Sequence, residues 1–248
     1  MYTKIQTWFG MIRLGLGALR LIRDPSKLDD VIQLAEKIGL DPEITRATEE
    51  DLRQRGPQSL RALETWPRIG RVEVDVLAKM AEGTFGRAYG DFLIRNKLDP
   101  NALPKRKVSS NGEYILAHLY ETHDLWHLLT GFAPDVAGEM GLQAFYMTQL
   151  PANIAYLLVA IGQLNTMIYA FNDRDARMQA IADGWTMGRA AKPLFGVEWD
   201  KMWDLPLVEV RRSLNIKIPR DEKEHLLIDN SYTYSNPALG STDCPQGA

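Results

Sequence analysis

Helical periodicity runs through almost the whole sequence and limits the fold more than any other feature. Apolar residues recur at three- and four-residue spacings, and candidate helix caps such as Asp41, Thr84 and Asp135 precede these stretches. No stretch alternates apolar and polar residues for long enough to indicate a strand, and residues 71–77 come nearest. The pattern predicts an all-α protein of about eight to ten helices, the last of them over residues 199–215.

The helices are expected to form one domain. The chain has 248 residues, enough for a sizeable core, and no composition shift before residue 225 marks an internal linker. We predict a single helical domain over residues 1–225. Residues 226–248 lack an apolar period along most of their length and are predicted to form a disordered tail.

Charge and cysteine content exclude several classes of protein. The formal net charge is −3 and no stripe of basic and aromatic residues is present, so we expect no nucleic-acid partner. Cys244 is the single cysteine, which excludes a disulfide framework and a thiolate metal site. Nucleotide-binding fingerprints and nucleophilic triads are also absent from the sequence.

Residues 152–171 are the most apolar stretch and are about as long as a membrane span. Polar side chains point in different directions around this predicted helix, and in lipid each would need a partner. We therefore expect either a core helix or a helix that lines an apolar groove, to which residues 145–147 can contribute. The polar residues are Asn153, Gln163, Asn165 and Thr166.

The first 23 residues carry a charge that the rest of the chain does not share. They contain four basic residues and no acidic one, although the whole chain is negative. Two interpretations remain open: a segment that lies on an anionic membrane surface, and a first helix of the core. No small-residue cleavage site follows, so the segment does not have the pattern of a signal peptide.

Three of the four histidines lie within ten residues, and two of these have metal-ligand spacing. His123 and His127 are four residues apart, which puts their Cβ atoms about 5–6 Å from each other on one helix face. They share that face with Leu116 and Leu119, so we expect them to point inward. His118 points away from His127 and is a poor candidate ligand. Two neutral imidazoles at this spacing are typical of a metal site.

Two carboxylates accompany the histidine pair. Asp124 lies about 60° from His127 around the helix, and it can either bind the metal directly or orient a histidine ligand. Glu139 belongs to the next helix, beyond the break at Gly131 and Pro134, and a helical hairpin can return it to the same ion. The predicted site is therefore His123, Asp124, His127 and Glu139. Zinc is the first choice of divalent ion, with iron, manganese or magnesium as alternatives.

The resulting pattern, H-D-x-x-H-x11-E, resembles the motif of the coenzyme Q (ubiquinone) biosynthesis family known as Coq-four. The likeness covers roughly residues 15–218 and includes four further segments. Within them, Trp66 and Ala81 depart from the family pattern. These segments are residues 19–39, residues 66–69, residues 81–89 and residues 199–216.

The resemblance implies a fold and a function. It implies an all-α protein that binds a metal, holds a polyprenyl chain in an apolar groove and acts in ubiquinone biosynthesis. The implied reaction is metal-dependent, oxidative C1 decarboxylation of a polyprenylated 4-hydroxybenzoate-type intermediate. His123, Asp124, His127 and Glu139 are then the catalytic residues. Arg68 and Arg87 could hold an anionic head group, or they could simply be solvated or paired.

Two other functions stay open. The chain could be a non-catalytic lipid-binding scaffold that organises the biosynthetic complex, or an unrelated metallohydrolase with Asp124 in the place of a zinc-protease glutamate. As partners, the resemblance implies the prenylated precursor, other ubiquinone biosynthesis enzymes, a membrane surface and possible homodimer formation. The location it implies is cytoplasmic and peripheral on the inner membrane, or the equivalent matrix side.

Overall fold

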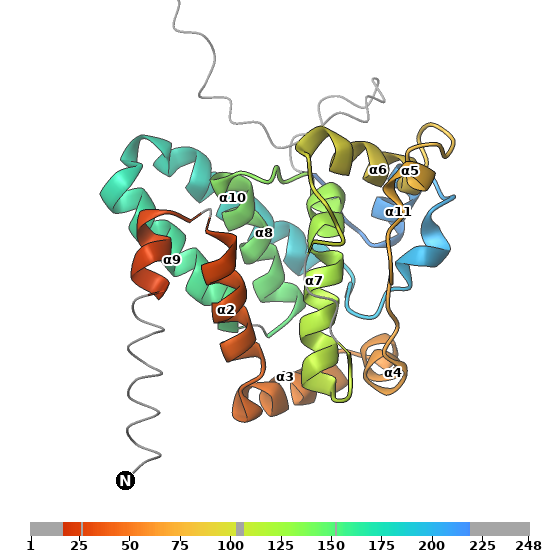
Figure 1. Ribbon diagram of the computed structural model, residues 1–248, viewed down its shortest axis with the longest axis horizontal. Helices are drawn as coiled ribbons and strands as arrows, with labels where there is room; N and C mark the ends of the chain where they lie inside the picture. The colour runs from red at the N-terminus through yellow and green to blue at the C-terminus, as the bar shows by residue number, and fades with distance from the viewer. Residues whose placement is uncertain (1–16, 26, 103–106, 152, 219–248) are drawn as a thin grey trace, which may run out of the picture.

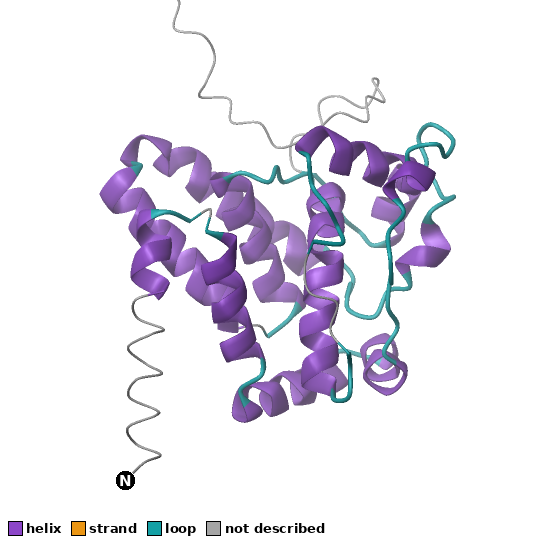
Figure 2. Cartoon of the chain, viewed as in Figure 1, coloured by secondary structure: helices purple, strands orange, loops and turns teal. Residues whose placement is uncertain are grey.

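The computed structural model of the chain describes residues 17–25, 27–102, 107–151 and 153–218. The regular secondary structure of these residues is entirely helical, with loops between the helices, no strand and a single isolated bridge between Thr84 and Pro206 (Figures 1 and 2). The all-α prediction is confirmed. The predicted tail, residues 226–248, and the start of the predicted first helix lie outside the described residues.

The chain is helical at residues 17–23 and then forms the numbered elements of Figure 1. They are α2 (Leu28–Gly39), α3 (Pro42–Gln54), α4 (Pro57–Thr65), α5 (Val74–Leu77), α6 (Phe85–Asn96), α7 (Asn111–Thr130), α8 (Val136–Gln149), α9 (Asn153–Tyr169), η1 (Phe171–Asp173), α10 (Arg174–Ala190), η2 (Trp199–Met202) and α11 (Leu207–Ser213).

Helix α7 runs through the middle of the molecule and carries the histidine motif (Figure 1). It packs against α2 and α3 near its start, against α6 and against α8. Thirteen of its twenty residues are buried, among them Leu125 and Trp126. Truncating a fully buried residue such as Trp126 to alanine costs about 3–5 kcal/mol. The motif is therefore held on a rigid central element.

Two apolar clusters hold the helices together. The larger one surrounds Trp126, Phe145 and Trp199 and contains residues of elements from α3 through to α11. The smaller one contains Leu21, Leu116 and Ile154 and fastens the helical residues 17–23 and α2 onto α9. Residues 145 and 146 are buried in the larger cluster, and their contribution to an apolar groove stays a prediction.

Helices α8 and α10 pack with their backbones in contact. A Cβ added at Gly184 of α10 would overlap the carbonyl oxygen of Gly141 on α8 and lie 2.9 Å from its carbon. One turn further on, Gly188 faces Phe145 and Thr148 in the same way. Only glycine permits this approach, which fixes the position of α8 and of the carboxylate that it carries.

The prediction of one helix over residues 199–215 is wrong. The segment forms η2 and α11, separated by a turn at residues 203–206. Pro206 has no N–H, and the backbone on either side of it bonds to the start of α6 instead. Phe85 N–H donates to the Leu205 carbonyl at 2.7 Å, and Leu207 N–H donates to the Gly83 carbonyl at 3.1 Å.

None of the helices in the described ranges has both the length and the apolar character needed to cross a lipid bilayer.

Candidate metal centre

The turn between α7 and α8 brings the two halves of the motif together. Gly131 ends α7 in the left-handed conformation, with φ of 78°, and its N–H donates to the His127 carbonyl at 2.9 Å. Asp135 then caps α8 by accepting from Gly138 N–H at 2.8 Å. The chain reverses direction within a few residues, so Glu139 in the first turn of α8 faces the last turns of α7.

Three of the predicted residues meet at one point. The ligand-capable atoms of His123, His127 and Glu139 all lie within 4.8 Å of one another. His127 Nε2 lies 3.1 Å from Glu139 Oε1, and His123 Nε2 lies 3.6 Å from Glu139 Oε2. The His127 side chain is 1% exposed, whereas His123 and Glu139 are 30% and 41% exposed. The group is anchored in the core and reachable from one side.

The hydrogen-bonding capacity of His127 shows that this group suits a cation. Its Nδ1 lies 3.0 Å from the Phe132 carbonyl, which can only accept, so Nδ1 carries the hydrogen. In the neutral ring Nε2 is then an acceptor, and it faces the carboxylate of Glu139, which is also an acceptor. Two facing acceptors need a positive species between them, either a proton or a metal ion. The donor set of two imidazoles and one carboxylate fits a divalent metal.

The ionisable groups of the site shift one another's pKa values: the Glu139 carboxyl is favoured as the anion, and the His123 imidazole is favoured in the protonated form, whose proton a bound metal would displace. Desolvation raises the pKa of Glu139, but the neighbouring His127 and His123 outweigh it and hold the pKa of this carboxyl well below its usual range. Desolvation likewise lowers the pKa of His123, and the Glu139 carboxylate more than offsets this, so that the pKa rises. Glu139 is therefore ionised, as a metal ligand must be.

Two neighbours of the site were not predicted as part of it. Tyr146 stacks on His123 with ring centroids 6.1 Å apart and on Trp126 at 4.3 Å, so it limits the orientation of the His123 ring. Tyr146 is seven residues, or two helical turns, after Glu139 on α8, so the sequence puts both side chains on the same face of the helix. The other neighbour is the carbonyl oxygen of Phe132. Because every residue has a backbone carbonyl, the amino-acid sequence does not indicate that this one contacts the site.

Comparison with known proteins identifies the family. The sequence profile of "Coenzyme Q (ubiquinone) biosynthesis protein Coq4" matches residues 3–220. The chain belongs to the Coq4 family. Among curated members, the mitochondrial ubiquinone biosynthesis protein COQ4 homolog of Aedes aegypti is 28% identical over 204 residues, which is 79% of this chain and 71% of that protein. The Xenopus tropicalis homolog is 27% identical over 212 residues, 83% of this chain and 73% of that protein.

A solved structure has the same fold. The crystal structure of a Nostoc punctiforme protein superposes with a TM-score of 0.72 at 24% sequence identity. The match covers 82% of this chain and 96% of the Nostoc chain. The helical arrangement around α7 is thus shared by another protein of similar size.

Asp124, the fourth predicted residue, is not part of the three-residue group. It is half-buried on α7, and its charge contributes to raising the pKa of His123, after the larger effects of desolvation and Glu139. The role of Asp124 in this Coq4 protein stays a prediction. Of the two alternatives, orienting a histidine ligand fits its position better than binding the metal directly.

Replacing Asp124 with asparagine therefore provides a test. We expect Asp124→Asn to keep one metal ion per chain and to lower metal affinity by about tenfold, because outer residues tune rather than form a site. Metal titration of the purified variant measures this. Complete loss of metal would instead place the carboxylate among the ligands.

His118 lies outside the candidate metal centre, as predicted. It is buried against Phe195, with ring centroids 4.8 Å apart, and its Nε2 has no hydrogen-bond partner among the described residues. Burial, assisted by the charge of Arg68, lowers the pKa of His118 to about 3. The imidazole is therefore a neutral part of the core.

This histidine should make the stability of the protein depend on pH. The unfolded chain takes up a proton at His118 near its ordinary pKa of 6.5, whereas the folded chain does not do so until about 3. Stability is therefore lost as the pH falls through this window, by up to about 1.4 kcal/mol per pH unit. The variant His118→Leu should lose that slope in unfolding titrations at several pH values. An unchanged slope would show that His118 is protonated in the fold.

The two arginines considered for an anionic head group are paired within the chain. Arg68 forms a two-pronged ion pair with Glu121, and Arg87 bonds to Asp91 at 2.8 and 2.9 Å. These contacts support the simpler of the two interpretations, in which both residues are structural.

Proposed function

We propose that this Coq4 protein acts in ubiquinone biosynthesis as a metal-dependent enzyme that removes the C1 carboxylate from a polyprenylated 4-hydroxybenzoate-type ring. The proposal rests on one observation. Nε2 of His127 faces the carboxylate of Glu139, and both are acceptors, because the neutral His127 ring donates its one N–H hydrogen from Nδ1 to the Phe132 carbonyl. The names of the relatives, ubiquinone biosynthesis proteins, supply the pathway and not the reaction.

The residues present suit a reactive metal centre. His123, His127 and Glu139 would hold the ion, and three protein ligands leave a position for a substrate oxygen. When bound, a divalent ion there supplies Lewis-acid stabilisation of negative charge on a carboxylate or phenolate oxygen. Zinc fits this ligand set, and iron, manganese or magnesium are the alternatives to be tested.

The chemistry needs charge stabilisation at the ring. In the oxidative reaction, dioxygen is the oxidant: it bonds to C1 as a hydroperoxide while the oxygen para to C1 becomes a carbonyl. When the bond between C1 and the carboxyl carbon then breaks, carbon dioxide leaves and the electron pair forms the C1 carbonyl as the O–O bond breaks, giving a quinone and hydroxide. The partial exposure of His123 and Glu139 gives a substrate access to the centre, and the buried ring of His127 excludes water on the opposite side.

An apolar pocket offers a place for the polyprenyl tail. It lies between α2, α3, α7 and α9, is partly open to solvent and has a cavity volume of only about 30 Å³, so a tail would enter it as these helices separate. Ile38, Ile115 and Leu116 are among its lining residues. Leu119 also lines it and is one turn before His123 on α7, so the pocket lies within one helical turn of the centre along α7.

A non-catalytic role is the second candidate, because a deeply buried ligand such as His127 also suits a structural ion. In that case the protein would bind the prenylated ring and present it to other ubiquinone biosynthesis enzymes. Metal would then be needed for folding and binding and not for turnover.

Substrate turnover separates the two candidates. Purified protein loaded with metal should release carbon dioxide from a prenylated 4-hydroxybenzoate-type acid labelled at its carboxyl carbon, in the presence of dioxygen. Glu139→Gln keeps the size of the side chain and removes its charge, so it should fold and lose this release. Tight binding of the acid by the parent protein without any release would favour the scaffold.

A further inference from the structure

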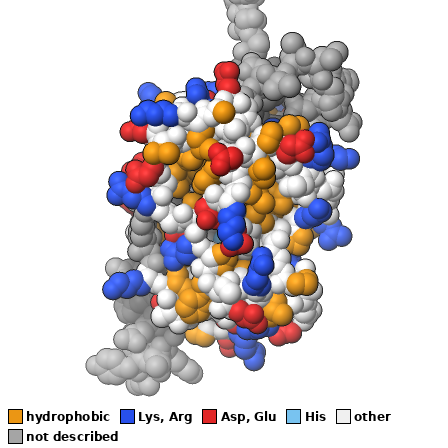
Figure 3. All heavy atoms as spheres, turned by 90° about the vertical axis from the view of Figure 1, so that its right-hand side faces the viewer, with side chains coloured by type: hydrophobic (Ala, Val, Ile, Leu, Met, Phe, Trp, Pro, Cys, Tyr) orange, Lys and Arg blue, Asp and Glu red, His pale blue; other side chains and the backbone are white. Residues whose placement is uncertain are grey.

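Helix α11 is not part of the candidate metal centre, although it belongs to one of the segments that resemble the Coq4 family. Its buried residues, Leu207 and Val210, hold it in the larger apolar cluster. Its outer side carries Glu209 and Arg212, which are exposed and form an ion pair. The side of the molecule on which α5, α6 and α11 lie mixes charges of both signs with apolar side chains, as ordinary surface does (Figures 1 and 3). Arg211 lies between these two sets and reaches the end of α7.

Arg211 bonds to the end of the helix that carries the histidine motif. Its Nε donates to the Leu129 carbonyl at 3.0 Å, and its Nη2 donates to the Leu128 carbonyl at 2.8 Å. The last carbonyl groups of an α-helix have no N–H of a following turn to accept from. A guanidinium therefore satisfies them and also interacts favourably with the helix dipole. Leu128 and Leu129 directly follow His127, the buried histidine of the candidate metal centre.

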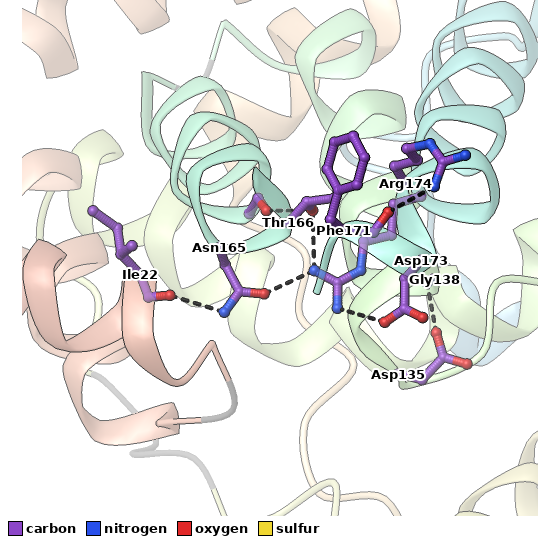
Figure 4. A network of polar contacts seen from close by, with 10 residues as sticks. Ile22, Asp135, Gly138, Asn165, Thr166, Phe171, Asp173 and Arg174 are labelled. Carbon is purple, nitrogen blue, oxygen red and sulfur yellow. Dashed lines mark hydrogen bonds and ion pairs between the residues drawn. The ribbon is translucent and has the colours of Figure 1, made fainter. Parts of the chain in front are cut away.

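The turn after these two residues determines how His127 is oriented. The Gly131 N–H bonds to the His127 carbonyl, and the Phe132 carbonyl bonds to the His127 ring. On the far side of this turn, Asp135 caps the start of α8 (Figure 4). On the near side lies the C-terminal segment, since a Cβ added at Gly131 would be 3.0 Å from Ile218 Cδ1. The turn is therefore held by α8 on one side and by the segment that contains α11 on the other.

We propose that Arg211 is a positioning residue of the metal centre. By bonding to the carbonyl groups of residues 128 and 129, it fixes the last turn of α7 relative to α11 and keeps the Phe132 carbonyl within reach of His127 Nδ1. The bond at Nδ1 leaves Nε2 as the acceptor that faces Glu139. The inference rests on the proposed function, because it takes the three converging residues as metal ligands.

Arg55 provides a matched control at the other helix of the site. Its Nη1 donates to the carbonyl groups of Thr148 and Gln149, at the end of α8, at 2.7 and 2.9 Å. Helix α8 carries Glu139 in its first turn, so this contact lies at the opposite end of the helix from the metal centre. Arg55 and Arg211 thus make the same kind of contact with a helix end, and only Arg211 makes it next to a candidate ligand.

Zinc titration and imidazole NMR of the full chain test the proposal. The variants are Arg211→Gln, Arg55→Gln and, as a charge control on α11, Arg212→Gln, at a side chain that is 68% exposed. Exchange of the nitrogen-bound hydrogen of His127 with solvent is followed in metal-free protein labelled with ¹⁵N at its four histidines. Zinc affinity is measured by calorimetric titration, and the melting temperature by circular dichroism.

We expect Arg211→Gln and Arg55→Gln each to lower the melting temperature by about 3–6 °C, because each loses hydrogen bonds from a charged donor. Only Arg211→Gln should also exchange the His127 hydrogen at least about tenfold faster and bind zinc about tenfold more weakly. Loss of a positive charge would by itself favour a cation, so weaker zinc binding reports positioning and not charge. Arg212→Gln should match wild type in all three measurements.

Wild-type hydrogen exchange at His127 in Arg211→Gln would overturn the proposal, and so would wild-type zinc affinity. Equal effects of Arg55→Gln on both quantities would also overturn it, because they would report general loosening of the fold. If Arg211→Gln does not fold, the same criteria apply to Arg211→Lys, which keeps the charge but not the two-pronged contact. A wild-type protein that binds no divalent metal would contradict the proposed function, whereas the exchange measurement needs no metal and tests Arg211 separately.

Discussion

The variant His127→Ala is expected to bind no metal at the centre. His127 contributes the most buried of the three converging groups, and its Nε2 is oriented by the bond from Nδ1 to the Phe132 carbonyl. Its loss leaves one imidazole and one carboxylate, too few for a tight site. Because changes outside the ligand set already cost about ten- to a hundredfold in affinity, removing a ligand should cost more than about a hundredfold. Metal titration by calorimetry measures this directly.

The control for this result lies on the same helix. His118 is also a buried histidine of α7, but it packs against Phe195 and is outside the group. His118→Leu should therefore bind metal like the parent protein. If the two variants lose metal equally, the loss reports damage to α7 and not removal of a ligand.

The variant Gly184→Ala is expected to be strongly destabilised. Its Cβ would overlap the Gly141 carbonyl oxygen, and a backbone atom cannot move aside without shifting α8. Overpacking of this kind costs about 3 kcal/mol or more, which corresponds to a fall of roughly 10 °C in melting temperature for a protein of this size. Thermal unfolding followed by circular dichroism measures it. Because α8 also carries Glu139, the variant should bind metal more weakly as well.

Gly39→Ala is the matched substitution. Gly39 is also helical, at the end of α2, and an added Cβ would meet only Leu116 Cδ1 at 3.5 Å, an ordinary contact. This variant gains helix propensity without a clash and should be neutral or slightly more stable. Similar melting temperatures for the two variants would contradict the backbone contact between α8 and α10.

Local chemistry made much of the fold predictable. Thr84 and Asp135 cap α6 and α8 as the sequence indicates, because a cap bonds to residues two or three positions away. Gly131 ends α7 for a similarly local reason. The spacing of His123 and His127, and the break before Glu139, were enough to predict that these side chains share one site.

What could not be predicted depends on partners distant in the sequence. The break between η2 and α11 arises because Leu205 and Leu207 bond to the backbone around Gly83, more than a hundred residues earlier. Asp124 is outside the three-residue group because of where α8 places Glu139. The small angle between Asp124 and His127 around α7 does not determine that position. The partners of Arg68 and His118 could likewise not be predicted, because they are distant in the sequence and come into contact only when the helices pack.

The central claim is that His123, His127 and Glu139 together hold one divalent metal ion. A crystal structure of the metal-loaded protein, with anomalous data collected on either side of the metal absorption edge, tests it most directly. We expect one anomalous peak per chain, in contact with His123 Nε2, His127 Nε2 and the Glu139 carboxylate. A peak that no two of these residues touch, or no peak in protein shown to contain the metal at one ion per chain, would contradict the account.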